Sequence, residues 1–231
     1  ILMALGLPLP RMVFAHGWWT VDGEKMSKSR GNFVDPAEIT REFGVDALRY
    51  FLFREMPFGN DGDFSRQALR RRYNSELAND LGNLVSRVVQ MVDRYLGGEL
   101  PRRPPLERPF NSKGVADEST AIYAAMESLA FQEALNRIWA VIGRLNRLID
   151  KEAPWKMAEK EPEKLRFLLF DLVWSLRIIA GWIAPFMPQT SAKMQALLGV
   201  RRPVAAMTPQ EVLEGASDAK ILKGPPLFPR K

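Results

Sequence analysis

The chain has 231 residues, of which 46% are hydrophobic, so it is long enough to bury a sizeable core. Thirty-three Lys and Arg against 27 Asp and Glu give a formal net charge of +6, which favours phosphate-rich partners but also occurs in many proteins that bind none. The absence of cysteine excludes a disulfide framework and a thiolate zinc site, and a single histidine leaves little material for other metal sites.

The chain opens with the apolar stretch ILMALGLPLP. This stretch is short, lacks basic residues and contains two prolines, so we expect neither a signal peptide nor a membrane-spanning helix, and a cytoplasmic location. Because the first residue falls in the middle of an apolar pattern, we also expect that an upstream portion is missing.

The first third of the chain predicts a short β-containing piece followed by two short helices. Residues 1–7 are typical of a helix end, and RMVFAHGWWTVDG, residues 11–23, predicts strand structure that ends in an Asp-Gly turn. Trp18 and Trp19 are neighbours, so at least one is expected to face inward. Asp35 as an N-cap and Pro36 at the first helical position predict a helix that breaks at Gly44 and resumes.

The rest of the chain predicts an antiparallel helical bundle, so the fold class is mainly α. Ser65 is expected to cap a long helix over 66–96, which ends at Gly97-Gly98. The Pro-rich segment 101–114 predicts an irregular connection, and helical periodicity returns over 117–128, 131–152, 162–184 and 188–199. The Pro-rich tail ILKGPPLFPRK has no helical period and is expected to lie extended over the bundle.

The loop GEKMSKSRGN, residues 23–32, concentrates positive charge between two glycines. Lys25, Lys28 and Arg30 lie within six residues, and Ser27 and Ser29 add hydroxyl donors. Such a loop suits polyphosphate binding, because ammonium groups offset the charge of a departing pyrophosphate. It does not have the spacing of a Walker loop. The alternative is a solvated basic turn, which is what most charged loops are.

The long helix also offers a candidate RNA surface. Its polar face carries amide and guanidinium groups at helical spacing: Asn79, Asn83, Arg87, Gln90 and Arg94. These groups can hydrogen-bond the base edges of an unstacked RNA loop, or they can form an ordinary solvated face. Trp155 follows a helix end and is either a core plug or an exposed stacking platform. We expect Asn146 to bond the backbone near residues 150–155 and so fix Trp155.

The string KMSKS within HGWWTVDGEKMSKSRGNFVDP resembles the signature loop of class I aminoacyl-tRNA synthetases. The resemblance implies that Lys25 and Lys28 stabilise the phosphates of ATP, with Lys28 acting on the transition state, and that Ser27 and Ser29 also contact ATP. It places His16 and Gly17 near the nucleotide. Taken alone, His16 reads more readily as a hydrogen-bonded structural residue.

The segments FGVDALRYFLFREMPFGNDGDFS and ELANDLGNLVSR, and the tail motif KGPPLFPR, resemble the bacterial methionyl-tRNA synthetase family. The resemblance to cysteinyl-tRNA synthetase, the nearest competitor, fades after about residue 35. The methionyl family implies that residues 1–34 end a Rossmann-type catalytic domain, residues 35–64 form a connective region, and residues 65–231 form a helical anticodon-binding domain with an extended tail.

The same resemblance implies the substrates and the residues that read the anticodon. The substrates are methionine, ATP with Mg and tRNA(Met), and Asn83, Arg87 and Trp155 would recognise the CAU anticodon, with Trp155 stacking on its first base. Four arginines at the start of the long helix would meet tRNA phosphates, or form a solvated turn with intrahelical pairs: Arg66, Arg70, Arg71 and Arg72.

The family's His-Ile-Gly-His type motif, methionine pocket and zinc-binding insertion are not in the sequence, so zinc is expected only in an upstream part. We therefore expect that this polypeptide alone does not activate methionine. The alternatives are a non-catalytic tRNA-binding module and a stable bundle in which neither site is formed.

Overall fold

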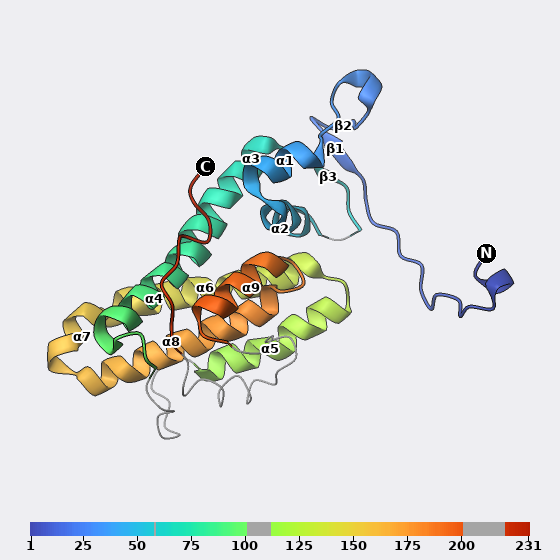
Figure 1. Cartoon of the computed structure of the whole chain (residues 1–231). Coiled ribbons are helices and arrows are strands. Elements are labelled where there is room, and N and C mark those ends of the chain that lie inside the picture. The colour runs from blue at the N-terminus through green and yellow to red at the C-terminus, as the bar shows by residue number, and fades with distance from the viewer. Residues whose placement is uncertain (58, 101–111, 201–219) are drawn as a thin grey trace.

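The computed structural model describes residues 1–57, 59–100, 112–200 and 220–231 (Figure 1). The described chain is mainly helical, as predicted. Its longer helices are α1 (Pro36–Phe43), α2 (Val45–Glu55), α3 (Arg66–Arg72), the π-helix η3 (Tyr73–Gly82), α4 (Asn83–Leu96), α5 (Ser112–Glu127), α6 (Phe131–Glu152), α7 (Pro154–Lys160), α8 (Pro162–Ile183) and α9 (Pro188–Leu197).

Three short strands form a small mixed sheet in the order β2-β1-β3. β1 (Trp19–Val21) pairs antiparallel with β2 (Glu24–Lys25) through the predicted Asp-Gly turn, in which both residues have positive φ, and β1 pairs in parallel with β3 (Gly62–Asp63). The sheet therefore joins the basic loop to the segment that precedes the long helix.

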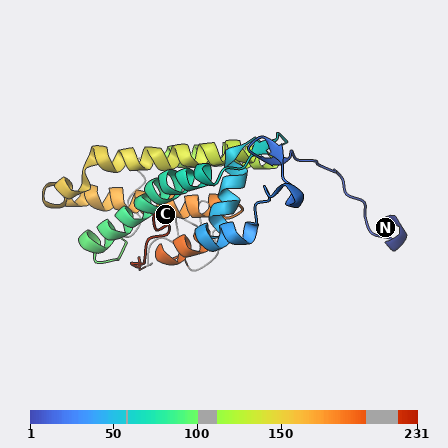
Figure 2. The ribbon, with the colours of Figure 1, turned by 90° about the horizontal axis from the view of Figure 1, so that it is seen from above.

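The predicted strand over 11–23 is wrong for its first part, because residues 7–18 have no regular structure and residues 11–16 are exposed. A strand requires a hydrogen-bonded neighbour, and within residues 11–23 the structure gives a paired strand only at β1. The expected helix end at 1–7 is one 3-10 turn, η1 (Met3–Leu5). This amino-terminal segment extends away from the bundle (Figures 1 and 2).

Capping chemistry sets the helix boundaries in the middle of the chain. The Asp35 carboxylate accepts a hydrogen bond of 2.9 Å from the Ala37 N–H, and Gly44, with φ +89°, separates α1 from α2. Ser65 Oγ accepts a bond of 3.2 Å from the Ala68 N–H, and Gly97, with φ +64°, ends α4. Both predictions are confirmed, but the predicted single helix over 66–96 contains a π-helical segment that its sequence does not signal.

The bundle is built around α8, which is mostly apolar and is buried from Leu165 to Ile183 apart from a few positions. α5 and α6 form an antiparallel pair, α9 returns along α8, and α4 packs on α8 (Figures 1 and 2). The predicted helices of this region are confirmed to within a few residues at their ends. The predicted irregular connection over 101–114 lies mostly outside the described residues, although α5 already begins at Ser112.

The tail runs back along the long helix, as expected (Figure 1). The Tyr73 hydroxyl donates to the Pro229 carbonyl at 2.9 Å, and Arg230 donates to the Asn79 side chain at 2.6 Å. Phe228 is buried against the edge of the Tyr73 ring. Within the residues that the structure describes, no helix is long and apolar enough to cross a membrane.

Candidate nucleotide-binding loop and nucleic-acid interface

The basic loop is closed on itself by the side chain of Asn32. Its amide oxygen accepts the Ser27 N–H at 2.8 Å, and its amide nitrogen donates to the Lys25 carbonyl at 3.2 Å. Between these points Lys28–Arg30 form the 3-10 turn η2, which ends at Gly31 with φ +73°. The loop has a defined conformation, and the positive φ at Gly31 explains the need for glycine there.

Carboxylates from the β3 segment hold the base of the loop. Asp61 accepts the Trp18 N–H at 2.7 Å. Asp63 accepts the Thr20 hydroxyl at 2.7 Å and the Gly23 N–H at 2.9 Å, and these two bonds lower the pKa of Asp63 below its ordinary value. The hairpin that carries the loop is thus tied to the connector by charge-assisted hydrogen bonds.

The loop cations differ in their partners. Arg30 forms an ion pair of 3.1 Å with Glu24. Lys25 Nζ lies 5.1 Å from the centre of the Trp18 ring and Lys28 Nζ lies 5.6 Å from that of Phe33. In the described chain neither lysine has a carboxylate within ion-pair distance, so both charges are available to an incoming anion.

Ser27 and Ser29 lie together at the tip of the loop, with their hydroxyl oxygens 2.7 Å apart. His16 is exposed and its Nδ1 lies 2.8 Å from the Gly17 carbonyl. A Cβ placed on Gly17 would lie 2.0 Å from the Asn60 carbonyl oxygen, so this glycine is required by close approach of two backbones. Trp18 is exposed whereas Trp19 packs 6.0 Å from Phe51, which confirms that one of the two tryptophans faces inward.

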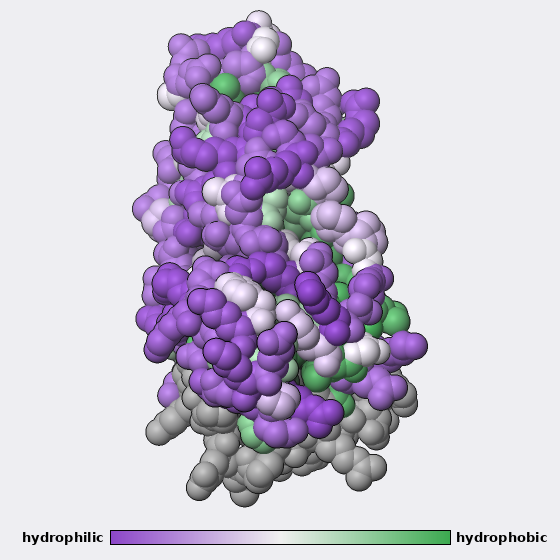
Figure 3. All heavy atoms as spheres, turned by 90° about the vertical axis from the view of Figure 1, so that its left-hand side faces the viewer, coloured by the Kyte–Doolittle hydropathy of each residue, from purple (hydrophilic) through white to green (hydrophobic). Residues whose placement is uncertain are grey.

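The second candidate site lies on the bundle, on the side of α4 and η3 that faces α6. A polar groove of about 410 Å³ opens there. Its lining comes from η3, α4 and α6: Asn79, Asp80, Asn83, Arg87, Gly143, Asn146, Arg147 and Asp150. The predicted polar face therefore contributes three residues to one groove. Figure 3 looks at this end of the bundle, where hydrophilic residues predominate and apolar residues gather on one side.

Arg87 is oriented across the groove by an ion pair. Its Nη2 lies 2.7 Å from Asp150 Oδ1, and 27% of the Arg87 side chain is exposed against 65% of the Asp150 side chain. Asn83 is exposed, and burial followed by the charge of Glu76 raises the pKa of Asp80. The groove thus offers amide, guanidinium and carboxylate groups, which together match the donors and acceptors of a base edge.

Trp155 faces solvent and is 52% exposed. It lies on α7, a short helix that sequence analysis did not predict, and this helix starts after Ala153 in a left-handed conformation with φ +47°. Pro154 and Met157 are buried, so the indole one position along points outward. Of the two interpretations of this residue, the exposed platform agrees with the structure. Trp155 follows Asp150, the partner of Arg87, by five residues.

The expected role of Asn146 is wrong. Its amide donates to the Asp80 carbonyl at 3.1 Å and to the Ile142 carbonyl at 3.3 Å, not to the backbone near residues 150–155. Side chains of an α-helix lean toward its N-terminus, so Asn146 of α6 reaches back to Ile142 and across to η3 instead of forward to the α6–α7 junction. Asn146 therefore joins α6 to η3.

The arginines at the start of the long helix mostly pair with carboxylates. Arg66 and Arg70 both reach Glu42 of α1, at 3.1 and 2.7 Å. Arg72 pairs with Glu55 and, at 2.9 Å, with Glu76. Only the last of these pairs is intrahelical, so the basic turn mainly fastens the long helix to the two helices before it.

Sequence reasoning missed the residues that hold the two sites. Asn32, Asp61, Asp63 and Asp150 bond to groups that the pattern of the sequence does not bring together. Only Asn32, a short polar residue after a glycine, carries a local signal for a loop closure. Across the described ranges, no group of three or more His, Cys, Asp and Glu could hold a metal ion.

Comparison with known proteins gives one consistent result. Residues 1–89 match the family model described as tRNA synthetases class I (M). The chain is 44% identical over its whole length to the methionine-tRNA ligase of Caldanaerobacter subterraneus and 43% identical to that of Bacillus subtilis, of which it covers 37% and 36%.

A solved structure agrees with these relatives. The Mycobacterium tuberculosis methionyl-tRNA synthetase in complex with methionyl-adenylate matches 99% of this chain with a TM-score of 0.80 and 35% identity, and the match covers 46% of that protein. The chain spans less than half the length of these proteins. The similarity to these methionine-tRNA ligases extends over the whole chain, including the residues after 35.

Proposed function

We propose that this methionyl-tRNA synthetase segment supplies two parts of the enzyme, the loop that closes on ATP and the surface that reads the CAU anticodon of tRNA(Met). In the whole enzyme, the methionine carboxylate attacks the α-phosphate of ATP and releases pyrophosphate. The tRNA 3′ end then takes the methionyl group from the adenylate. Residues 1–34, 35–64 and 65–231 would be the catalytic remnant, the connector and the anticodon-binding domain.

The loop has the chemistry that the first step requires. Lys25 and Lys28 rest on aromatic rings instead of carboxylates, so an incoming triphosphate gains their charge without breaking an ion pair. Ser27 and Ser29 supply hydroxyl donors at the tip. Their mutual hydrogen bond would be exchanged for bonds to phosphate oxygens. His16 and Gly17 would lie beside the nucleotide.

The main support for the proposed anticodon reader is the exposure of Trp155. Trp155 lies five residues after Asp150, the ion-pair partner of Arg87. An exposed indole is accessible to a base, and a base stacked on an aromatic ring contributes about 1–3 kcal/mol. Asn83 and Arg87 would then hydrogen-bond the edges of the anticodon bases that lie in the groove.

The reader is tested by the binding of anticodon stem-loops to alanine variants. Asn83→Ala and Arg87→Ala should each weaken a CAU stem-loop by roughly tenfold or more, which corresponds to about 1.4 kcal/mol. Arg94→Ala is the matched control, because Arg94 is exposed on the same helix and does not line the groove. Equal losses in Arg87→Ala and Arg94→Ala, with no loss in Asn83→Ala, would show that the helix contributes only positive charge.

The loop is tested by methionine-dependent pyrophosphate exchange. The chain alone should show only background exchange, and exchange should appear when the upstream portion of a similar ligase is added. In that mixture Lys28→Ala should abolish exchange, whereas Arg30→Ala, which removes a cation already paired with Glu24, should change it little. Exchange by the chain alone would contradict the proposal.

A non-catalytic tRNA-binding module is the second candidate, because the bundle has a continuous buried core of its own. Anticodon-dependent binding without any restoration of exchange by the upstream portion would favour this module.

A further inference from the structure

We propose that hydrogen bonds of Glu76 and Trp139 keep the segment η3 in its π-helical form, and that this form turns Asn83 and Arg87 toward the groove. This inference rests on the proposed function of the groove as an anticodon reader. Glu76 and Trp139 are positioning residues, because neither lines the groove.

A π-helix bonds each N–H to the carbonyl five residues earlier. Such helices are rare, and they occur frequently at functional sites. Here it occupies Tyr73–Gly82, directly before Asn83. The sequence of this segment contains good α-helix formers such as Leu77, Ala78 and Leu81, so local preference does not explain the wider turn. Contacts from other elements must stabilise it.

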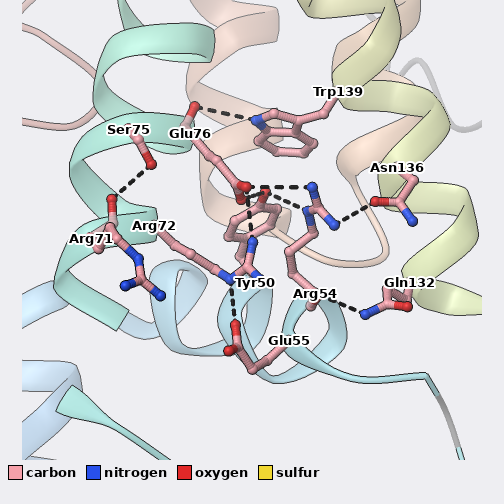
Figure 4. A network of polar contacts seen from close by, with 10 residues as sticks. All are labelled: Tyr50, Arg54, Glu55, Arg71, Arg72, Ser75, Glu76, Gln132, Asn136 and Trp139. Atoms are coloured by element: carbon pink, nitrogen blue, oxygen red, sulfur yellow. Dashed lines mark hydrogen bonds and ion pairs between the residues drawn. The ribbon is translucent and has the colours of Figure 1, made fainter. Parts of the chain in front are cut away.

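Glu76 is the first such contact (Figure 4). Its carboxylate accepts hydrogen bonds from the Tyr50 hydroxyl, from Arg72 at 2.9 Å and from Arg54 at 3.4 Å, and only 17% of its side chain is exposed. Burial and then the charge of Glu76 raise the pKa of Tyr50, so the phenol stays protonated and donates. Helices α2 and α3 thus fix this side chain of η3.

Backbone carbonyls of η3 provide two more contacts, both to α6. Trp139 Nε1 donates to the Glu76 carbonyl at 3.3 Å, and Asn146 donates to the Asp80 carbonyl at 3.1 Å. Trp139 is 7% exposed, and its ring lies 4.5 Å from that of Tyr50. These two carbonyls are four residues apart, so α6 holds η3 at both ends of one turn.

The exit of the segment is also closely packed. A Cβ on Gly82 would lie 3.0 Å from the Leu77 carbonyl oxygen, so the residue that leads into α4 has no room for a side chain without a shift.

These contacts of η3 set the rotation of α4 about its helix axis. A π-helix has more residues per turn than an α-helix, so conversion of this ten-residue segment toward α-helical bonding would rotate Asn83 and Arg87 about the helix axis. Such a rotation would move both side chains away from the side of α4 that faces α6 and would break the ion pair of Arg87 with Asp150. The hydrogen bonds of Glu76 and Trp139 therefore set the direction in which the two reader residues point.

The test uses the full chain with Trp139→Phe, which removes one hydrogen bond and keeps an aromatic ring. Trp182→Phe is the matched control, since Trp182 is 5% exposed and lies on α8. The affinity of Trp139→Phe for a CAU stem-loop should fall up to about fivefold, as the loss of one hydrogen bond allows. Its preference for CAU over a loop with a changed first base should fall with it, while the salt dependence stays the same.

A graded pair of variants separates positioning from packing. Glu76→Gln keeps an acceptor oxygen and should retain more of the preference for CAU than Glu76→Ala. The thermal stability of Trp139→Phe should fall no further than that of Trp182→Phe. An unchanged preference in Trp139→Phe and both Glu76 variants would overturn the inference and leave these residues a purely structural role.

Amide hydrogen exchange in the free protein gives a readout that does not need RNA. Exchange over residues 77–84 should be faster in Trp139→Phe than in the unmodified protein and unchanged in Trp182→Phe. Unchanged exchange over 77–84 in Trp139→Phe would overturn the inference by itself. If the unmodified protein does not distinguish the two stem-loops, the proposed reader fails, and that result is separate from the exchange result.

Discussion

Replacing Phe228 by Ala should detach the tail and lower the stability of the bundle. Phe228 is 8% exposed and meets the edge of the Tyr73 ring, with 5.8 Å between ring centres and planes at 89°. Truncation of a packed Phe costs about 3–5 kcal/mol. Residues 220–231 form no helix and lie along the surface of the long helix, so they can detach together. The loss in unfolding free energy then cannot exceed the free energy with which this tail docks on the helix. We therefore expect the lower value, about 3 kcal/mol.

The assay is thermal unfolding followed by circular dichroism. For a chain of this size, 1 kcal/mol corresponds to about 2–4 °C, so Phe228→Ala should lower the Tm by about 6–12 °C. Leu222→Ala is the control, because Leu222 belongs to the same tail and is 49% exposed, and it should lower the Tm by less than about 3 °C. Equal Tm values for Phe228→Ala and the unmodified chain would refute the view that the tail is part of the packed structure.

Three further predictions concern the loop and the proposed reader. The hydrogen bonds from Thr20 and Gly23 hold the pKa of Asp63 below 3.8, so they stabilise the hairpin fully above pH 3.8 and are lost as the pH falls through the pKa of Asp63 in the folded protein. Amide exchange at Gly23 should accelerate in that acidic range, and Asp63→Asn should remove this pH dependence. Gly17→Ala would place a Cβ 2.0 Å from a backbone carbonyl oxygen, so the amide spectrum of β1 and β3 should change, and an unaltered spectrum would contradict the close approach. Trp155→Ala should cost less than about 1 kcal/mol of stability, because the side chain is half exposed, and a large drop in Tm would mean that Trp155 is a core residue.

The helix boundaries could be predicted because their signals are local. Asp35, Ser65 and Gly97 act on backbone groups within a few residues, so the residue type and its place in the apolar pattern are sufficient. The short helix α7 was missed for the opposite reason. Its start depends on Ala153 in a left-handed conformation, which alanine seldom adopts, so Pro154 in the first turn was not enough to predict it.

The π-helical segment could not be predicted, because it depends on tertiary contacts. The buried positions Leu77, Leu81 and Leu84 satisfy ordinary helical spacing, so the pattern gives no reason to expect a wider turn. The hydrogen bond from Trp139 and the contacts of Glu76 join residues that are far apart in the sequence. The erroneous expectation for Asn146 has the same origin, since its partner is on a neighbouring helix.

The candidate sites were found by motif and by residue type, not by their supporting contacts. The loop string and the polar face of the long helix identified Lys25, Lys28, Asn83 and Arg87 as candidates. The sequence left the exposure of Trp155 open, and only the three-dimensional arrangement shows that the indole faces solvent. Asp150, the partner of Arg87, needed the structure because it lies on another helix.

The most direct test of the proposed reader is a titration of tryptophan fluorescence with a CAU anticodon stem-loop at two salt concentrations. The same titration is made with a stem-loop whose first anticodon base is changed, and with Trp155→Ala. The account predicts quenching that requires both the native base and Trp155. Equal and purely salt-dependent binding of both stem-loops, with the same quenching in Trp155→Ala, would contradict it and leave the bundle with only a basic surface.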